Sequence, residues 1–367
     1  MRILICGGGT AGHVNPAFAI ASIIKENNHN AKILFVGTKS GLEARLVPQE
    51  GYDIKYIDVN GIRRTFSLRN LIAFKKAWQA YRASKKIISE FKPDIVVGTG
   101  GYVSGPVIYA AQKMGIKTAI HEQNAFWGIT TRLLMNKADK VMLSFEPDYN
   151  KLKRKDNIVI TGNPVRSEVG RLDKQSARRV LGIDARPLIL SCGGSLGAKK
   201  INDAVCEMLK TSDKEGLFYH IHGTGKRGYN TAKERLNEAG ISFENGGIIR
   251  VSEYIYDMPR VMTASDLVIC RAGAITLAEL AVLGKPSILI PSPNVTENHQ
   301  YYNAKIFEKK GAAIIIEDKD LNGKSLYRTI KKLFEDNSKL AKMSKSALEL
   351  AKPDASNAIY KEIMSLL

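Results

Sequence analysis

The sequence has 367 residues, 44% of them hydrophobic and 25% charged, with a net charge of +19. This length suits two domains of comparable size, and the composition is that of a folded globular protein, which excludes the disordered and fibrous classes. No window approaches the roughly 18 uninterrupted apolar residues that span a bilayer, and the N-terminus lacks the pattern of a secretory signal. We therefore expect a cytoplasmic protein that can still lie on a membrane surface.

The positive charge is concentrated in the first part of the chain. Residues 1–163 contain 24 basic and 12 acidic residues, whereas the longer remainder contains 31 and 24. An excess of cations fits binding to nucleic acid, binding to anionic lipid, or simply solubility. The sequence has no RNP-type aromatic strand, zinc finger or recognisable helix-turn-helix, so nucleic acid is the weakest of the three.

In chain order, short β-branched runs alternate with helical segments. The first set of predicted strands covers residues 2–6, 32–36, 54–59, 94–98, 118–121, 140–143 and 157–161. Amphipathic helices are predicted between several of them, for example over 15–28 and 68–91. Nearly continuous apolar strands that alternate with helices predict a parallel sheet covered on both faces.

The same pattern then restarts in the second half. Its predicted strands cover residues 188–191, 220–222, 248–251, 267–269, 287–290 and 313–316. ILICGGGTAGH at 3–13 is echoed by LILSCGGSLGA at 188–198, each a buried strand followed by a glycine-rich turn and a helix. We predict an α/β protein of two doubly wound, Rossmann-like domains, with a cleft between the carboxyl edges of their sheets.

The predicted domain boundary lies at Gly162-Asn163-Pro164, because proline breaks regular structure. The first domain then covers residues 1–163 and the second 164–343. The final segment, 344–367, is predicted as a helix that is interrupted at Pro353 and crosses back onto the first domain.

Four glycine-rich loops can bring backbone N–H groups close to phosphate oxygens. They cover residues 7–12, 98–106, 193–198 and 271–276. Gly7, Gly9 and Gly12 satisfy the dinucleotide spacing, but the second predicted strand ends without the acid that binds a ribose, so a dehydrogenase is disfavoured. Any one loop can be a plain tight turn. Together they favour a nucleotide diphosphate on one domain and a pyrophosphate-bearing acceptor on the other.

Polar residues follow several predicted strands. His13 comes directly after the first loop, where a neutral imidazole can take a proton from a sugar hydroxyl or position the acceptor. Residues 121–124 and Arg166 follow strands of the first domain, where they are either ligand contacts or an ordinary strand exit and a hinge cap. Glu279 can accept bonds from two ribose hydroxyls or simply face solvent. The amides of residues 298–303 suit sugar hydroxyls.

The four cysteines carry no chemistry of their own in this reading. Cys6, Cys192 and Cys270 end apolar runs, and Cys206 lies in a helical stretch. Because no pair has metal-ligand or C-x-x-C spacing, we expect buried, reduced thiols.

These motifs together resemble the MurG family, the N-acetylglucosamine transferases of the lipid-linked step of peptidoglycan synthesis. The resemblance runs from residue 7 to about residue 304, through GGGTAGH, GTGGYVSGP, HEQN, TGNPVR, GGSLGA, RAGAITLAE and ENHQYYNA in that order. Many enzymes of the two-domain GT-B glycosyltransferase fold share the RAGA segment and the later HQ and NA pairs. GYVSGP and HEQN narrow the match to this family.

The resemblance implies an inverting transfer of N-acetylglucosamine (GlcNAc) from UDP-GlcNAc to the C4 hydroxyl of N-acetylmuramate (MurNAc). The acceptor would be undecaprenyl-pyrophosphoryl-MurNAc-pentapeptide, lipid I, and the product lipid II. No cofactor and no metal site is expected. The family also implies a part in cell-wall biogenesis, cell shape and cell division, with other cell-wall synthesis proteins as partners.

The resemblance also implies roles for individual residues. Donor contacts fall to Thr10, Ala11, Gly12, Asn124, Arg166 and Ser195; the backbone of Ile255 would meet uracil; Ala274, Ile275, Thr276, Leu277, Ala278 and Glu279 would hold diphosphate and ribose; Gln300 and Asn303 would face the GlcNAc hydroxyls; and His13, Tyr102 and His121 are the acceptor-side and catalytic candidates. Ala11 departs from the family's commoner glycine, and we expect it to be tolerated because alanine adds only one methyl group.

Residues 63–78 mix cations with large apolar side chains, and Leu71, Phe74 or Lys75, and Trp78 recur at helical spacing. A helix of this kind can lie among lipid headgroups, where each nearby Lys or Arg contributes about 1 kcal/mol on anionic lipid. It can equally be an ordinary amphipathic helix with its apolar side in the core. With the resemblance, we expect this segment to hold the protein on the cytoplasmic face of the cell membrane.

Three other functions compete with this one. A diacylglycerol glycosyltransferase of the same fold is disfavoured by GYVSGP and HEQN. A UDP-sugar epimerase would need no lipid and no basic apolar face. A basic nucleic-acid-binding protein would bind RNA with a steep salt dependence and would have no affinity for UDP.

Overall fold

The computed structural model describes residues 1–59, 69–212, 216–243 and 246–367, of which 69–75, Thr296 and Asn337 are described by their backbone alone. The chain forms two compact units. The first consists of Met1–Val165 together with Pro353–Leu367, and the second of Arg166–Lys352. Each unit has its own parallel sheet and its own hydrophobic core, so the predicted α/β architecture of two doubly wound domains is confirmed.

The first unit contains a seven-stranded sheet in the order β3-β2-β1-β4-β5-β6-β7, and every recorded pairing is parallel. Its strands are β1 (Arg2–Gly7), β2 (Lys32–Gly37), β3 (Asp53–Tyr56), β4 (Ile95–Gly100), β5 (Lys117–Glu122), β6 (Lys140–Leu143) and β7 (Ile158–Ile160). β1 and β4 are almost wholly buried, as expected when helices cover both faces.

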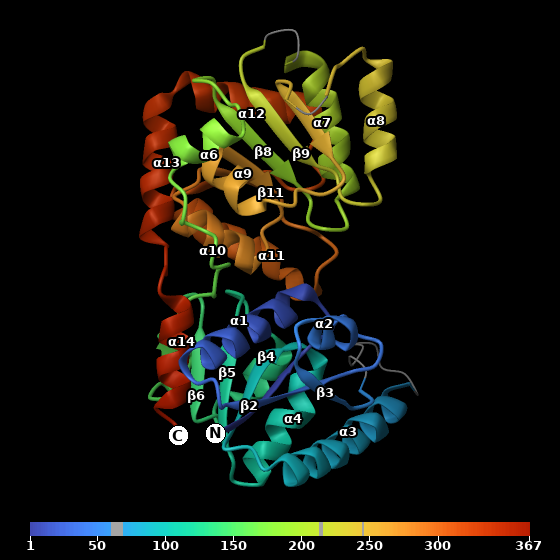
Figure 1. The fold of residues 1–367 in the computed structure, drawn as a ribbon, viewed down its shortest axis with the longest axis vertical. Coiled ribbons are helices and arrows are strands. Elements are labelled where there is room, and N and C mark those ends of the chain that lie inside the picture. The colour runs from blue at the N-terminus through green and yellow to red at the C-terminus, as the bar shows by residue number, and fades with distance from the viewer. Residues whose placement is uncertain (60–68, 213–215, 244–245) are drawn as a thin grey trace. The chain divides into compact units, whose positions relative to one another are not determined.

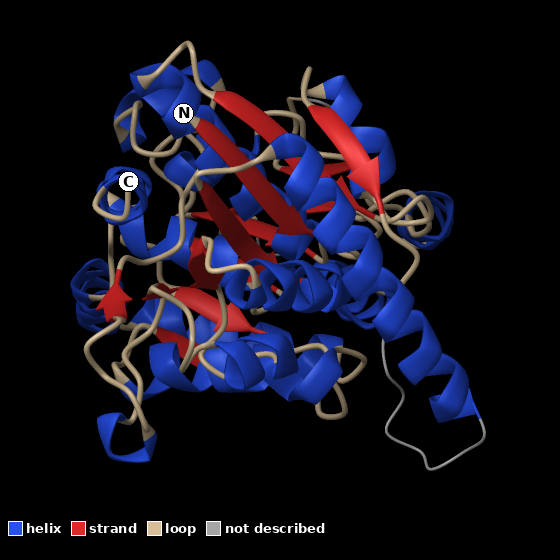
Figure 2. Ribbon diagram, turned by 90° about the horizontal axis from the view of Figure 1, so that it is seen from below, coloured by secondary structure: helices blue, strands red, loops and turns tan. Residues whose placement is uncertain are grey.

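Helices pack on each face of this sheet (Figure 1; Figure 2). They are α1 (Ala11–Asn27), α2 (Glu43–Gln49), α3 (Arg69–Phe91), α4 (Gly101–Lys113), α5 (Ile129–Leu134) and the C-terminal α14 (Ala355–Met364), with a short 3-10 helix, η1, over Tyr149–Lys151. One core lies under α1, α2 and α14, and the other under α3, α4 and α5. α1 begins four residues before the predicted Asn15, because Pro16 is accommodated inside the helix.

The last helix belongs to the first unit. α14 contacts α1 and β6, and Ile359 and Ile363 are completely buried in the core beside them. Lys140 on β6 forms an ion pair with Glu362, with 2.7 Å between Nζ and Oε2. Helices from the two ends of the chain, α1 and α14, therefore lie side by side on one face of the first sheet (Figure 1).

The second unit repeats the strand order of the first. Its six-stranded parallel sheet has the order β10-β9-β8-β11-β12-β13, in which β8, the strand of the sequence echo, occupies the central place that β1 has in the first sheet. Its strands are β8 (Leu188–Cys192), β9 (Tyr219–Gly223), β10 (Ile249–Ser252), β11 (Leu267–Cys270), β12 (Ser287–Leu289) and β13 (Ala313–Ile315).

The helices of the second unit are α6 (Lys174–Val180), α7 (Lys199–Ser212), α8 (Tyr229–Glu238), α9 (Met258–Ala264), α10 (Ala274–Val282), α11 (His299–Lys309), α12 (Gly323–Glu335) and α13 (Asn337–Glu349), with a 3-10 helix, η2, over Thr296–Asn298. The core on one face of the sheet contains residues of α7, α8 and α12. α9, α10 and α11 lie on the other face (Figure 1).

A polar cluster is enclosed in this core. Ser191 Oγ lies 2.7 Å from His220 Nε2 and 2.7 Å from His222 Nδ1, and all three side chains are fully buried. The other nitrogen of each ring, His220 Nδ1 and His222 Nε2, is buried without a hydrogen-bond partner. Buried polar atoms without partners are uncommon and lower the stability of a core.

Candidate functional site

The predicted site residues of the first unit lie where its parallel strands end. β1 leads into the first glycine-rich loop, in which Thr10 is the N-cap of α1 and Ala11, Gly12 and His13 form its first turn. β4 leads into Gly100 and Gly101 at the start of α4, which carries Tyr102. β5 ends at Glu122, followed by Asn124. The carboxyl edge of one sheet therefore brings these segments together.

The buried carboxylate of Glu43 is hydrogen-bonded to the first glycine-rich loop. Oε2 of Glu43 accepts a hydrogen bond from the Gly9 N–H at 3.0 Å, and Oε1 accepts from both the N–H and the hydroxyl of Thr38 at 2.9 Å. A Cβ at Gly8 would lie 2.5 Å from Oε1 of this carboxylate. The loop thus keeps its shape through a charged group, and the Gly9 N–H is already engaged.

Glu43 was not among the predicted site residues. It lies in the first turn of α2, 34 residues beyond the glycine that it binds, and it is 1% exposed. An acidic residue at the start of a short helix is ordinarily a solvated one, so no sequence signal separates this buried carboxylate from a surface glutamate.

The His13 ring is fixed by two oxygen atoms on its Nδ1 side. Nδ1 lies 3.1 Å from the carbonyl oxygen of Thr99 and 3.2 Å from Oε1 of Gln123. The Thr99 hydroxyl also donates to the His13 carbonyl at 2.8 Å. Gly100 has a φ of 101°, and a Cβ there would lie 2.7 Å from Nδ1, so only glycine leaves room for this ring.

His121 lies deeper in the same unit. It is 1% exposed, its Nε2 lies 3.0 Å from the carbonyl oxygen of Gly162, and its Nδ1 lies 2.9 Å from Nε2 of Gln123. Burial lowers the pKa of His121, against the opposing effects of the Gly162 bond and of Glu122. The ring is therefore neutral at physiological pH and has both nitrogens engaged.

Glu122 shapes the loop that carries Asn124. Its carboxylate accepts from the Asn124 N–H at 3.1 Å, from the Gly128 N–H at 3.0 Å and from the Thr131 hydroxyl at 2.7 Å. Glu122 is 4% exposed. Of the HEQN motif, the first three side chains are buried and tie the loop down, while Asn124 is half-buried.

In the second unit, the predicted donor residues lie around the start of α10. Gly273 is the N-cap, and Ala274, Ile275, Thr276, Leu277, Ala278 and Glu279 are the first six residues of the helix. Glu279 lies in the second turn with 4% of its side chain exposed. The N-terminus of this helix and a buried carboxylate therefore lie about one turn apart.

Arg166 and Glu279 form a bidentate ion pair. Nε of Arg166 lies 2.6 Å from Oε1, and Nη2 lies 2.9 Å from Oε2. Burial alone would disfavour the charged guanidinium, but the hydrogen bond and charge of Glu279 outweigh this and raise the pKa of Arg166. The two residues are 113 positions apart in the chain, so their pairing could not be deduced from spacing.

The remaining predicted residues lie on loops and on α11 of the same unit. Ser195 is exposed in the loop after β8, and Ile255 is buried after β10 between the exposed Tyr254 and Tyr256. Oε1 of Gln300 accepts from the Ser292 N–H at 2.9 Å, and Nδ2 of the buried Asn303 donates to the Ala272 carbonyl at 3.3 Å.

The backbone before α11 is strained. Glu297 and Asn298 have φ values of 56° and 52°, in the left-handed region; asparagine adopts this region more readily than most residues, so the strain lies mainly at Glu297. Strain of this kind is concentrated at functional sites, where surrounding contacts maintain it. Here it sets the entry angle of the helix that carries Gln300 and Asn303.

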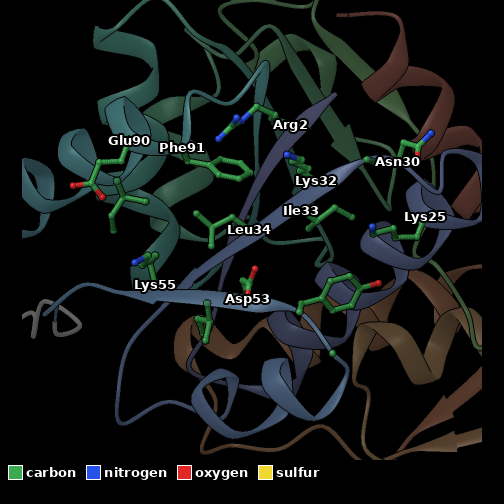
Figure 3. Close-up of a pocket in the computed structure, with 15 residues that line it drawn as sticks. Arg2, Lys25, Asn30, Lys32, Ile33, Leu34, Asp53, Lys55, Glu90 and Phe91 are labelled. Carbon is green, nitrogen blue, oxygen red and sulfur yellow. The ribbon is translucent and has the colours of Figure 1, made fainter.

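A hollow of about 830 Å³ lies at the opposite, amino edge of the first sheet (Figure 3). It is lined by Arg2, Lys25, Lys32, Lys55, Asp53, Phe91 and their neighbours, and the Arg2 guanidinium stacks 4.8 Å from the Phe91 ring centre. None of the predicted site residues lines it. Ligands of open α/β sheets bind at the carboxyl edge, so this hollow is set apart from the candidate site.

Within the described ranges, no cluster of three His, Cys, Asp or Glu side chains could hold a metal ion. The same residues include no helix that combines the length and the apolar character needed to cross a membrane. The four cysteines are unpaired thiols; Cys6, Cys206 and Cys270 are buried, while Cys192 is partly exposed.

The chain is similar to known proteins along its whole length. Residues 3–143 match the glycosyltransferase family 28 N-terminal domain, and residues 188–359 match its C-terminal domain. A protein of Acetivibrio thermocellus is 45% identical over 368 residues, covering 100% of this chain and 98% of that one. A protein of Thermoanaerobacter sp. (strain X514) is 46% identical over 367 residues and 100% of both chains. Both are named UDP-N-acetylglucosamine–N-acetylmuramyl-(pentapeptide) pyrophosphoryl-undecaprenol N-acetylglucosamine transferase.

Solved structures are also similar to this chain over nearly its whole length. The crystal structure of MurG from Acinetobacter baumannii has a TM-score of 0.80 and 28% identity and covers 99% of each chain. The UDP-GlcNAc 2-epimerase of Neisseria meningitidis, solved with UDP-GlcNAc, has a TM-score of 0.67 at 15% identity and covers 100% of each chain. The second likeness is one of fold alone.

Proposed function

The chain belongs to glycosyltransferase family 28 and, within it, to the N-acetylglucosamine transferases of the MurG family; from this membership we propose how its two units share the reaction. The enzyme transfers GlcNAc from UDP-GlcNAc to N-acetylmuramyl-(pentapeptide) pyrophosphoryl-undecaprenol. The observation that carries this function is full-length identity of 42–46% to transferases of that name. The C4 hydroxyl of MurNAc attacks the anomeric carbon, UDP leaves, and the configuration at that carbon is inverted.

The donor binds to the second unit. The N–H groups at the start of α10 face the diphosphate, and they stabilise the negative charge that UDP gains as it departs. Glu279 accepts hydrogen bonds from the ribose hydroxyls. The negative charge of an unpaired Glu279 carboxylate would repel the diphosphate. In addition to its contact with the donor, Arg166 therefore neutralises that charge through its bidentate pair with Glu279.

The base and the sugar of the donor meet the surrounding loops. Ile255 contacts uracil through its backbone, and Ser195 approaches the nucleotide from the loop after β8. Gln300 and Asn303 bind the GlcNAc hydroxyls. The carbonyl of Gln300 is held by the Ser292 N–H, which orients the amide group as a donor to a sugar hydroxyl.

The acceptor binds to the first unit. His13 takes the proton of the attacking hydroxyl, and Tyr102 lines the same edge, where a Cβ on Gly9 would meet its ring at 2.9 Å. Thr10, Ala11, Gly12 and Asn124 contribute donor contacts from this unit. His121 is enclosed, so its part in the reaction is to support its neighbours.

An aromatic patch on α3 and α4 suits a lipid surface. Trp78 is 60% exposed, its ring centre lies 5.3 Å from that of Tyr81, and Tyr81 lies 5.4 Å from Tyr109. Lys85 and Lys113 lie over the Tyr81 and Tyr109 rings at 5.9 and 5.7 Å. Aromatic rings beside lysines fit the headgroup region of an anionic leaflet, where the polyprenyl acceptor is held.

This patch includes only part of the predicted membrane segment. Residues 60–68 lie outside the described ranges, as do the side chains of 69–75. Reversing the charge at Lys85 and Lys113 should reduce flotation of the enzyme with anionic liposomes, whereas reversal at Lys233 on α8 should not. Unchanged flotation of the Lys85 and Lys113 variant would show that this patch does not bind the membrane.

The function is tested by UDP release from UDP-GlcNAc, with and without a short-chain lipid I analogue, alongside UDP-glucose. We expect release that requires the acceptor and the N-acetyl sugar. Release from UDP-GlcNAc without acceptor would instead indicate an epimerase or a hydrolase. Absence of release in folded protein would overturn the transferase assignment.

A further inference from the structure

A chain of hydrogen bonds runs through the first unit from the backbone of Gly162 to the ring of His13. Its members are His121, Gln123 and His13, and its contacts are 3.0, 2.9 and 3.2 Å long. His121 and Gln123 are 1% and 2% exposed, so water does not compete for these bonds. The Gly162 carbonyl oxygen at the buried end can only accept a hydrogen bond, and this sets the direction of every bond that follows.

The Gly162 carbonyl fixes the position of the proton on His121. Nε2 faces the Gly162 carbonyl, so Nε2 carries a hydrogen and donates it. The buried ring is neutral, because burial lowers its pKa, and Nδ1 therefore has a lone pair. That lone pair accepts a hydrogen bond from the amide nitrogen of Gln123.

His121 fixes the orientation of the Gln123 amide. Its Nε2 donates both to His121 Nδ1 and to the His121 carbonyl at 3.0 Å, so two acceptors determine which end of the amide is nitrogen. Turning the amide over would place its oxygen against both acceptors. Oε1 must then point to His13.

Gln123 and Thr99 together fix the position of the proton on His13. Nδ1 faces two oxygen atoms, the Thr99 carbonyl and Oε1 of Gln123, and neither can donate. Nδ1 therefore carries the hydrogen, and the lone pair of the neutral ring is on Nε2. The ring is presented in the one tautomer that can accept a proton at Nε2.

We propose that Gln123 is a positioning residue for the transfer, which selects the Nδ1–H tautomer of His13 and leaves its Nε2 as the base. This rests on the proposed function of His13. In the reaction the O–H bond of the MurNAc C4 hydroxyl breaks and its proton goes to Nε2. The oxygen forms the new bond to the anomeric carbon, and the bond from that carbon to UDP breaks, with its electron pair leaving on UDP.

The same arrangement stabilises the product of the proton transfer. Protonated His13 keeps its Nδ1–H on two carbonyl oxygens, whose partial negative charges favour the imidazolium. No carboxylate contacts the ring among the described residues: Glu43 is taken up by Gly9 and Thr38, and Glu122 by Asn124, Gly128 and Thr131. Tyr102 and the neutral His121 are the other titratable groups at this edge. An uncharged amide orients the base without holding a proton on it.

The proposal is tested with two substitutions at this position and one matched control. Gln123→Leu removes both polar ends at similar volume, and Gln123→Glu replaces the amide by a carboxylate. Gln112→Glu is the control, because Gln112 is a partly buried glutamine of the same unit whose amide donates to the Leu134 carbonyl instead. The imidazole nitrogens are followed by long-range proton–nitrogen NMR in the free enzyme, with His13 assigned by its loss in His13→Ala. The pH profile of kcat/KM is measured with the lipid I analogue.

We expect wild-type His13 to show an unprotonated Nε2. Gln123→Leu should give a mixture of tautomers and lower kcat about 100-fold, with KM for UDP-GlcNAc unchanged. In Gln123→Glu the acidic limb of the profile should move to higher pH by about one unit or more, because the carboxylate favours protonated His13. Gln112→Glu should match wild type in both measurements.

The proposal is overturned if folded Gln123→Leu keeps the wild-type tautomer and pH profile. If Gln123→Leu does not fold, Gln123→Glu decides alone, and an unmoved acidic limb rejects the proposal. The NMR result does not depend on turnover. A wild-type enzyme with the expected tautomer but no acceptor-dependent UDP release would therefore reject the proposed function and leave the hydrogen-bond chain in place.

Discussion

In both units the central strand runs into a glycine-rich loop and then a helix, yet the polar groups at the two sheet edges are of different kinds. At the edge of the first unit, His13 is surrounded by neutral partners, Thr99 and Gln123, while the nearby carboxylates are bonded to backbone N–H groups. At the edge of the second unit, Arg166 and Glu279 form a charged pair beside the start of α10. Under the proposed function, the same topology supports a base, His13, in one unit and a charged pair at the diphosphate site in the other. The fold provides the position, and the side chains provide the chemistry.

Removing the proposed base should have the largest effect on turnover. His13→Ala should lower kcat by about 1,000-fold, because the attacking hydroxyl then loses its proton acceptor. Binding of UDP-GlcNAc, measured by calorimetry, should change little, since we propose that the second unit holds most of the donor. Turnover within a few-fold of wild type would show that His13 is not the base that takes the proton.

Acid should weaken the second unit through the histidines in its core. Burial lowers the pKa of His222 to about 4, and burial together with His222 lowers the pKa of His220 well below its ordinary value. The unfolded chain takes up protons as the pH falls through about 6.5, whereas folded His222 does so only near 4. Stability is therefore complete above pH 6.5 and decreases between 6.5 and 4, by up to about 3 kcal/mol for His222.

Urea unfolding at pH 7.5 and pH 5, followed by far-UV circular dichroism, measures this loss. The variant His222→Asn should show a flatter dependence on pH. The two tryptophans, Trp78 and Trp127, both lie in the first unit, so their fluorescence follows that unit separately. An equal pH dependence in wild type and His222→Asn would refute the assignment to this cluster.

Glu43→Gln tests how much the buried Glu43 side chain stabilises the first unit. Glutamine keeps the volume but presents an NH₂ group to an N–H donor, so at least one charge-assisted hydrogen bond to Gly9 or Thr38 is lost. The free energy of unfolding of this unit should fall by about 2 kcal/mol. The urea midpoint of tryptophan fluorescence reads out the change, and Glu50→Gln, an exposed neighbour, should leave that midpoint in place.

The smallest effect is expected for a substitution that only weakens the Arg166–Glu279 ion pair. Glu279→Gln still offers one oxygen to the ribose but no longer balances Arg166, whose side chain is 43% exposed and so partly solvated. We expect kcat/KM for UDP-GlcNAc to fall by roughly tenfold. Glu308→Gln removes an ion pair with Lys305 on α11 that is partly exposed on both sides, and it should have no such effect. Equal kinetics of the two variants would contradict a role of the Arg166–Glu279 pair in donor binding.

Much of this architecture could be predicted from local patterns. The buried runs at β1 and β8, with their glycine-rich turns, predicted two doubly wound units, because strand burial and turn chemistry are encoded over about ten residues. The start of α1 was predicted too late, since Pro16 looks like a helix boundary but is tolerated inside the helix.

The candidate site depends on contacts that local patterns do not contain. Glu43 reaches back 34 positions to Gly9, and Arg166 pairs with Glu279 across 113 positions. The order of acceptors and donors from Gly162 to His13 depends on which way one amide is turned, and three segments from different strands decide it. Sequence motifs could nominate His13, His121 and Arg166, but they could not show which groups hold them.

The return of α14 to the first unit has a consequence for synthesis of the protein. Residues 1–165 leave the ribosome first, but Ile359 and Ile363 complete one face of their core. The second unit is a continuous stretch of chain, Arg166–Lys352, and needs nothing made later. Domains generally fold as units while the chain is being made. The unit that is translated first is therefore the last to be finished, and it keeps part of an apolar surface uncovered until the final helix is released.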